Sequence, residues 1–150
     1  MQQKTESYYG DARQTGRQMR WIVKHFYMDM APYATLTHQE IFDKVKKLPF
    51  RPDPKNIELL KRPKFTMEQF GPGGDCDDKS ICIASWAKLN NIPWDFIAVG
   101  RRKGDSWKIP LTHVFVRLYY LNNALNVDAT YSTNVIGLTS GVHYDREVII

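Results

Sequence analysis

The sequence contains few cysteines and no long hydrophobic run. Cys76 and Cys82 are the two cysteines of a 150-residue chain, too few for a disulfide scaffold. On one helix they would lie about 9 Å apart along the axis, which disfavours a bond between them. The roughly eighteen consecutive apolar residues of a membrane span are absent, and the N-terminus, MQQKTESYYG, lacks the apolar stretch of a signal peptide. These absences predict a cytoplasmic protein without membrane contact.

The composition is that of one ordinary globular domain. Apolar residues make up 43% and charged residues 25% of the chain, which excludes disordered, collagen-like and coiled-coil proteins. We expect residues 1–10 to be a loose segment and residues 11–150 to form a single domain. The net charge of +5 permits an acidic partner. Nucleic acid is not a favoured partner, because the basic clusters lack interleaved aromatic residues: Lys44/Lys46/Lys47, Lys61/Arg62/Lys64 and Arg101/Arg102/Lys103.

Hydrophobic periodicity and turn residues predict an α+β fold. Expected helices span 11–30, 37–48 and 75–89, and a proline-rich irregular segment spans 49–65, followed by a short helical turn after Thr66. Expected strands span 94–99, 112–120, 125–130 and 147–150. Residues 80–87, SICIASWA, carry no charge on any side, which predicts a buried central helix. Helices followed by antiparallel strands are typical of the α+β class.

Cys76 stands at the expected start of that central helix, directly after the glycine-rich loop 71–74. Asp75 suits the N-cap and Asp78 can reach back to it. A helix N-terminus lowers the pKa of a thiol, which makes Cys76 a candidate nucleophile, although the carboxylates around it oppose this effect. A free cysteine in an apolar helix is also commonly a small core residue, and this is the interpretation of Cys82.

His113 and Asp128 lie on successive expected strands and can serve as base and orienting residue for a thiol. In a hairpin with an even loop, the two side chains face the same side of the sheet. A two-residue turn at Asn122–Asn123 would place Asp128 opposite Arg117, about 13 Å along the strand from His113. A longer loop over 119–122 would bring them closer. Strand histidines and strand-end aspartates are also common structural residues, so the pairing is a hypothesis.

Three sequence blocks together resemble the transglutaminase-like superfamily, above all its small bacterial and bacteriophage members. The blocks are residues 73–79 (GGDCDDK), 113–116 (HVFV) and 127–130 (VDAT), and residues 53–63 (DPKNIELLKRP) resemble the segment before the cysteine in those members. The resemblance covers residues 37–132. It implies a papain-like fold, in which the cysteine heads a central helix packed on an antiparallel sheet. It also implies a catalytic triad of Cys76, His113 and Asp128.

The activity implied is that of a cysteine peptidase, amidase or acyltransferase acting on a peptide or protein substrate through a thioester, with hydrolysis favoured over crosslinking. The backbone N–H of Cys76 is a natural oxyanion donor, and the Gln69 side chain is a candidate for a second. The alternative is a non-enzymatic bacteriophage virion or assembly component that uses the same groove to bind peptides. Thiol reactivity of Cys76 would distinguish the two.

No cofactor and no metal are expected. Asp75, Asp77 and Asp78 lack the glycine and distal glutamate of a calcium loop, and the cysteines lack zinc-site spacing. His143 with Asp145 is interpreted as a solvated turn.

Overall fold

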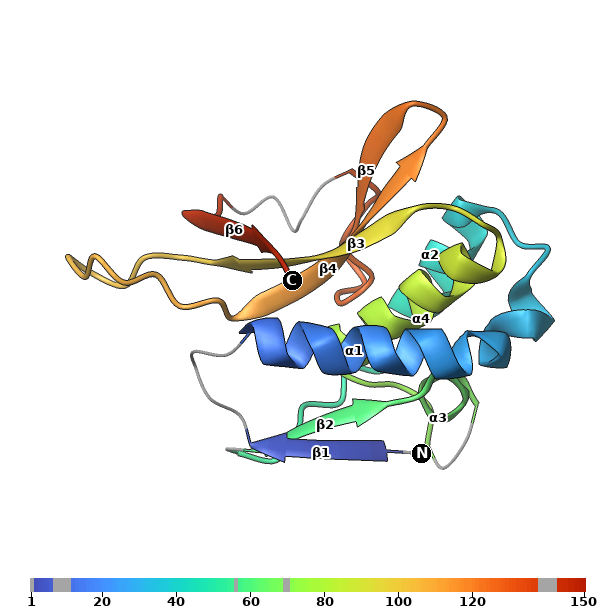
Figure 1. Ribbon diagram of the computed structural model, residues 1–150, viewed down its shortest axis with the longest axis horizontal. Coiled ribbons are helices and arrows are strands. Elements are labelled where there is room, and N and C mark those ends of the chain that lie inside the picture. The colour runs from blue at the N-terminus through green and yellow to red at the C-terminus, as the bar shows by residue number, and fades with distance from the viewer. Residues whose placement is uncertain (1, 7–11, 56, 69–70, 138–142) are drawn as a thin grey trace.

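The computed structural model describes residues 2–6, 12–55, 57–68, 71–137 and 143–150, and it has an α+β fold (Figure 1). The helices are α1 (Ala12–Phe26), the 3-10 helix η1 (Tyr27–Tyr33), α2 (His38–Lys46), α3 (Pro63–Met67) and α4 (Cys76–Leu89). The strands are β1 (Gln2–Glu6), β2 (Ile57–Lys61), β3 (Trp94–Gly100), β4 (His113–Tyr120), β5 (Asn123–Val127) and β6 (Arg146–Ile149). The predicted class is therefore confirmed.

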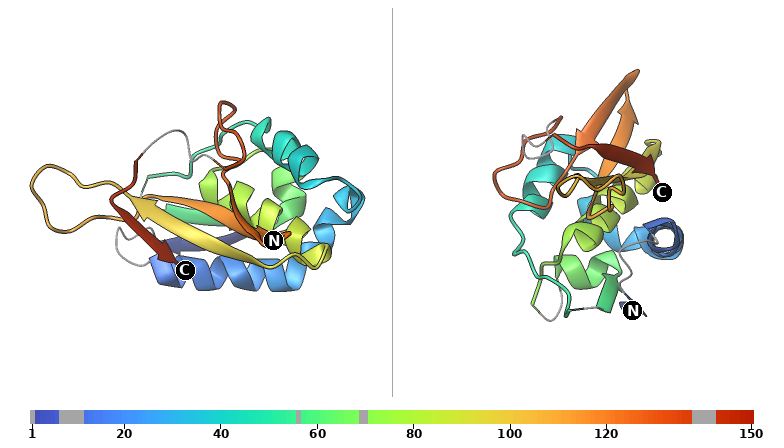
Figure 2. Two further views of the ribbon diagram at one scale, coloured as in Figure 1. Left: turned by 90° about the horizontal axis from the view of Figure 1, so that it is seen from above. Right: turned by 90° about the vertical axis from the view of Figure 1, so that its left-hand side faces the viewer.

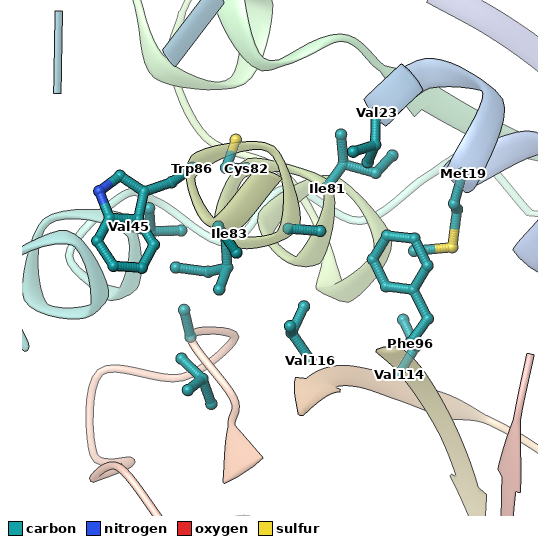
Figure 3. Close-up of a cluster of buried hydrophobic side chains, with 14 of the residues drawn as sticks. Met19, Val23, Val45, Ile81, Cys82, Ile83, Trp86, Phe96, Val114 and Val116 are labelled. Atoms are coloured by element: carbon teal, nitrogen blue, oxygen red, sulfur yellow. The ribbon is translucent and has the colours of Figure 1, made fainter. Parts of the chain in front are cut away.

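Helix α4 forms the centre of the core, as the uncharged run 80–87 predicts. The other helices and strands β3 and β4 all contact it, and every residue from 77 to 87 is buried. Figure 3 shows Ile81 beside Val23 of α1 and Trp86 beside Val45 of α2, on different sides of α4. Each buried aliphatic side chain contributes about 1.5–3 kcal/mol of transfer free energy. Burial on all sides therefore fixes where the first turn of α4 lies.

Strands β3 to β6 form an antiparallel sheet in the order β5-β4-β3-β6. Alternate residues of β4, Val114 and Val116, belong to the core around α4, whereas Phe115 packs with Ile97 and Val99 in a second cluster. The views of Figure 1 and of Figure 2, right, place α1 and α4 between this sheet and the β1–β2 ribbon. The N-terminus of α4 lies close to the start of β4.

The β1–β2 ribbon corrects two expectations. Gln2–Glu6 are not loose but pair antiparallel with Ile57–Lys61, inside the segment expected to be irregular. Residues 7–10 lie outside the described part of the chain. The strand β1, QQKTE, contains no apolar residue, so no alternation of apolar and polar residues marks it. Residues 2–6 form a strand because their backbone pairs with β2. The two strands are more than fifty residues apart, so the residues around β1 do not reveal the pairing.

The helical segments differ from expectation mainly at their ends. The first helix was expected to reach residue 30, but α1 ends at Phe26 and continues as η1, which contains Pro32. Pro32 disfavours α geometry in Ala31, the residue before it, and so opposes a continuation of the α-helix through the end of η1. The capping box of Thr37 and Glu40 at the start of α2 is confirmed. Within the described residues, no helix combines the length and apolar character needed to cross a membrane.

The β4–β5 hairpin turns one residue earlier than Asn122–Asn123. Its turn residues are Leu121 and Asn122, with φ of 52° and 64°, and Tyr120 pairs with Asn123. Positive φ at both central residues is the geometry of a type I′ turn, which matches the twist of a hairpin. Arg117 pairs with Asn126, so Asp128 does not lie opposite Arg117. The last pair of this register joins Val116 to Val127. The next residues along, Phe115 and Asp128, then lie side by side, and His113 is two residues from Phe115 on the same face of β4.

Candidate active site

Cys76 is the first residue of α4, and its position is set by the capping of that helix. Asp75 accepts hydrogen bonds from the backbone N–H groups of Asp77 (3.1 Å) and Asp78 (3.2 Å), and Asp78 accepts in return from the Asp75 N–H (3.3 Å). The capping box predicted from the sequence is therefore present. Asp78 also accepts from the Lys61 N–H of β2 at 3.0 Å. The first turn of α4 is thus tied both to its own cap and to the neighbouring ribbon.

The loop before Cys76 is more tightly held than a glycine-rich sequence suggests. Gly73 and Gly74 are buried, and their N–H groups donate to Thr66 O (2.7 Å) and Pro49 O (3.1 Å). A Cβ at Gly74 would lie 2.5 Å from the Asp78 Cβ, so only glycine permits the cap to approach this closely. The glycines therefore serve close packing against the helix start.

His113 and Asp128 are brought together, as predicted. His113 Nε2 lies 2.6 Å from Asp128 Oδ2, and the Asp128 side chain is fully buried while 11% of the His113 side chain is exposed. Tyr131 and Tyr144 flank the imidazole with ring centroids at 6.0 Å and 6.3 Å and interplanar angles of 20°. The bond to Asp128 engages Nε2 and leaves Nδ1 for another partner.

The Asp128 carboxylate is fixed by contacts of its own segment. Its Oδ1 accepts from the Thr130 N–H at 3.2 Å, and its backbone carbonyl accepts from the Asn134 amide at 2.9 Å. Lys79 of α4 donates to the Thr130 carbonyl at 3.1 Å, which attaches this segment to the central helix. Neither Asn134 nor Lys79 was identified from the sequence, because a turn residue and a helical lysine carry no distinguishing pattern.

Cys76 and His113 line one groove of about 370 Å³, together with Thr112, Val114 and Ala98. The Val114 N–H, directly after His113, favours the thiolate form of Cys76. The groove thus joins the start of α4 to the start of β4. A carbonyl group placed in it would have the thiol, the imidazole and the helix N-terminus on its boundary.

Of the two opposing effects expected at Cys76, the helix N-terminus and the neighbouring carboxylates, the one that raises the pKa prevails. Burial raises the pKa of the thiol well above its ordinary value, and the carboxylates of Asp75, Glu58 and Asp128 add to this, while the Val114 N–H acts in the opposite direction. The Cys76 thiol can also donate weakly to Asp77 Oδ1, at 3.8 Å. A raised pKa keeps the Cys76 thiol neutral near pH 7, so an attack by its sulfur requires a base that accepts the thiol proton.

A carboxylate cluster lies beside Cys76. Asp53, Asp75 and Asp78 place oxygen atoms within 4.8 Å of one another, so the structure groups Asp75 and Asp78 with Asp53 rather than with Asp77. Burial and mutual repulsion raise the pKa of each of the three to about 7, and Asp53 hydrogen-bonds Asp75. Among the described residues this is the group best placed to hold a cation. Asp53 and Asp78 already accept backbone N–H groups of Leu59 and Lys61, and Asp75 caps α4.

The remaining candidates lie elsewhere. Cys82 is fully buried in the core and is a free thiol like Cys76, as predicted. His143 is largely exposed, 3.6 Å from Asp145. Gln69, the candidate second oxyanion donor, lies outside the described residues.

Comparison with known proteins adds no assignment: the chain matches no protein-family model and no curated protein.

Proposed function

We propose that the chain is a thiol enzyme that cleaves or transfers an amide or peptide bond. In this proposal Cys76 is the nucleophile, His113 the base and Asp128 the residue that orients the imidazole. The observation that carries it is the 2.6 Å hydrogen bond between His113 and a fully buried Asp128, at the edge of a groove that also holds Cys76. A buried carboxylate bound to one imidazole nitrogen selects the tautomer in which the other nitrogen can accept a proton.

The reaction begins when the Cys76 sulfur attacks the substrate carbonyl carbon and His113 Nδ1 accepts the thiol proton. The oxyanion so formed is stabilised by the Cys76 backbone N–H and by the positive end of the α4 dipole. Collapse of this intermediate breaks the C–N bond, and His113 returns the proton to the leaving amine. A thioester remains on Cys76, and attack by water releases a carboxylic acid and restores the thiol.

The cysteine at the head of a buried helix, packed on an antiparallel sheet, supports the papain-like arrangement that the resemblance to transglutaminase-like proteins implies. Hydrolysis is favoured over crosslinking, because water needs no second binding site whereas an acceptor amine does.

The alternative is a non-enzymatic phage virion or assembly protein that binds peptides in the same groove. The raised pKa of Cys76 is the observation that favours it.

The test measures how fast iodoacetamide modifies each cysteine, with sites assigned by mass spectrometry, and whether the protein degrades unfolded casein. We expect Cys76 to react much faster than the buried Cys82, His113→Ala to slow Cys76 alone, and Cys76→Ala to abolish casein degradation. Cys82→Ala is the matched control and keeps the activity. Slow and equal modification of both thiols, unaffected by His113→Ala, contradicts the enzyme and favours the peptide-binding alternative.

A further inference from the structure

A second cavity, of about 710 Å³, lies between the start of α1, strand β6 and the loop that joins β3 to β4. Figure 1 shows this loop extending well beyond the sheet at the left. Four cationic side chains and one exposed tryptophan distinguish its lining: Arg13, Lys103, Lys108, Arg146 and Trp107. Lys103, Trp107 and Lys108 belong to one loop, but Arg13 and Arg146 come from opposite ends of the sequence, so the five residues gather only in the fold.

The cavity has a defined wall. A Cβ at Gly100 would lie 1.7 Å from the Pro110 carbonyl oxygen, so the two ends of the loop meet in tight contact at the sheet edge. Arg146 of β6 donates to the Ile109 carbonyl at 3.0 Å, and Lys108 lies 5.3 Å from the Trp107 ring centroid. These contacts hold two of the cations and the aromatic ring on the same loop surface.

The charge of this cavity is not neutralised within the described part of the protein. No described Asp or Glu lines it, and none of the four cations forms an ion pair with a described carboxylate. Like charges gathered in one concave surface raise the local potential and attract anions. An anionic group bound there would offset the repulsion among the four side chains.

The cavity adjoins the groove of Cys76, because Ala12 and Leu111 line both. The groove itself has the opposite polarity, with Asp53, Glu58 and Asp75 in its lining. A chain lying across both therefore meets carboxylates around the thiol and cations beside it. This polarity disfavours a continuous phosphate backbone, which would have to pass the carboxylates, and favours a peptide with localised negative charge.

We propose that the substrate is a peptide or protein segment with acidic side chains to one side of the scissile bond, and that this cavity holds them. The identification as a substrate subsite rests on the proposed thiol-enzyme function. Cations on flexible side chains can pair with Asp or Glu carboxylates, and Trp107 offers an apolar surface for the adjoining residue. The specificity-determining residues are then the four cations of the cavity, Arg13, Lys103, Lys108 and Arg146.

The probe is a short, capped, fluorescein-labelled peptide with two adjacent glutamates, compared with the same peptide carrying glutamines and with a labelled single-stranded oligonucleotide. Binding is measured by anisotropy in the Cys76→Ala protein, so that no turnover intervenes. In parallel, each unlabelled probe is tested for protection of wild-type Cys76 against iodoacetamide. The variant pair Lys103→Glu/Lys108→Glu removes cavity charge. Lys24→Glu/Lys64→Glu is the control, since it changes the net charge equally outside both cavities.

We expect the glutamate peptide to bind about tenfold more weakly to the cavity variant, from the loss of two exposed ion pairs, and to be unaffected by the control. It should also slow modification of Cys76, and the glutamine peptide should do neither. Equal binding of the two peptides, equal weakening by both variant pairs, or tighter binding of the oligonucleotide overturns the inference. A protein whose Cys76 is unreactive but which still binds the glutamate peptide through this cavity refutes the enzyme and retains the anionic-peptide site.

Discussion

The ammonium group of Lys79 donates to the backbone carbonyls of Leu48 at 2.7 Å and Thr130 at 3.1 Å, and the residue is 1% exposed. It thereby connects the central helix to the residue that follows the C-cap of α2 on one side and to the segment after Asp128 on the other. Burial lowers the pKa of this lysine. A buried lysine bound by carbonyl groups holds the strand end that carries Asp128 against the helix that carries Cys76.

Lys79→Met should therefore destabilise the fold although it keeps an apolar stem of similar length. Two buried carbonyls lose their donor, and we expect a loss of roughly 2 kcal/mol in the free energy of unfolding, measured by urea titration. The exposed Lys24 on α1 is the matched control, and Lys24→Met should change stability by less than about 0.5 kcal/mol. An equal effect of the two substitutions would show that the Lys79 contacts contribute nothing.

A site residue can be predicted from the sequence where its neighbours in the chain mark its position. Cys76 is such a residue, because Asp75, Asp78 and the uncharged run mark a helix start. The distance from His113 to Asp128 cannot be predicted in this way. Registers that differ by two residues leave the same side chains facing the core, so alternation cannot choose between them.

Lys79 also gives no local signal, since its burial depends on carbonyls that come from Leu48 and Thr130, distant in sequence. The raised pKa of Cys76 is visible in the sequence only in part, through the neighbouring carboxylate of Asp75. A helix N-terminus is visible in the sequence, but the burial of the sulfur and the proximity of Glu58 and Asp128 exist only in the fold.

Leu121 occupies the first central position of the β4–β5 turn with φ of 52°, and 77% of its surface is exposed. A leucine in the left-handed region is strained, whereas asparagine adopts it readily. Leu121→Asn should raise the free energy of unfolding by about 0.5 kcal/mol, which a urea titration can detect as a higher midpoint. The control is Leu36→Asn, which removes a partly buried leucine at a position with no positive φ and should destabilise. A lower midpoint for Leu121→Asn would contradict the turn assignment.

Cys82→Ala should test the separation of the two thiols. Cys82 is fully buried in the core, and this burial raises the pKa of its thiol. We expect a loss of about 1 kcal/mol from the small cavity left behind, with casein degradation and Cys76 alkylation unchanged. Loss of activity in a protein that still unfolds cooperatively would mean that Cys82 takes part in the chemistry.

The carboxylate cluster should make stability fall as pH rises from about 4 to about 7. The pKa of Asp53, Asp75 and Asp78 is raised to about 7 in the folded protein, first by burial. An unfolded aspartate loses its proton near pH 3.9, so in this interval the folded state holds more protons than the unfolded state. The free energy of unfolding then declines with rising pH and levels off above about 7.

Urea titrations across this interval can measure the decline, and Asp53→Asn should make it shallower because one of the three groups no longer titrates. Asp105→Asn, an exposed aspartate of the β3–β4 loop, serves as the control and should leave the slope unchanged. Stability that increases with pH over the same interval would show that the three carboxylates are ionised and well paired in the folded protein.

The substitution Asp128→Asn distinguishes an orienting carboxylate from a merely neighbouring negative charge, because the two roles change Cys76 in opposite directions. As a neighbouring charge, Asp128 raises the pKa of the Cys76 thiol, so its removal alone should speed alkylation. As an orienting group, it holds His113 in the tautomer whose Nδ1 accepts a proton. An amide can keep the bond from the Thr130 N–H but turns a donor toward His113 Nε2, which favours the wrong tautomer.

We therefore expect slower alkylation of Cys76 by iodoacetamide near neutral pH and a fall in turnover of about 10² to 10⁴. Asp95→Asn, which removes the same charge beside Tyr119, should leave the alkylation profile in place. If Asp128→Asn gives a faster reaction or an overlaying profile, Asp128 does not orient His113, and the hydrogen bond between them is structural.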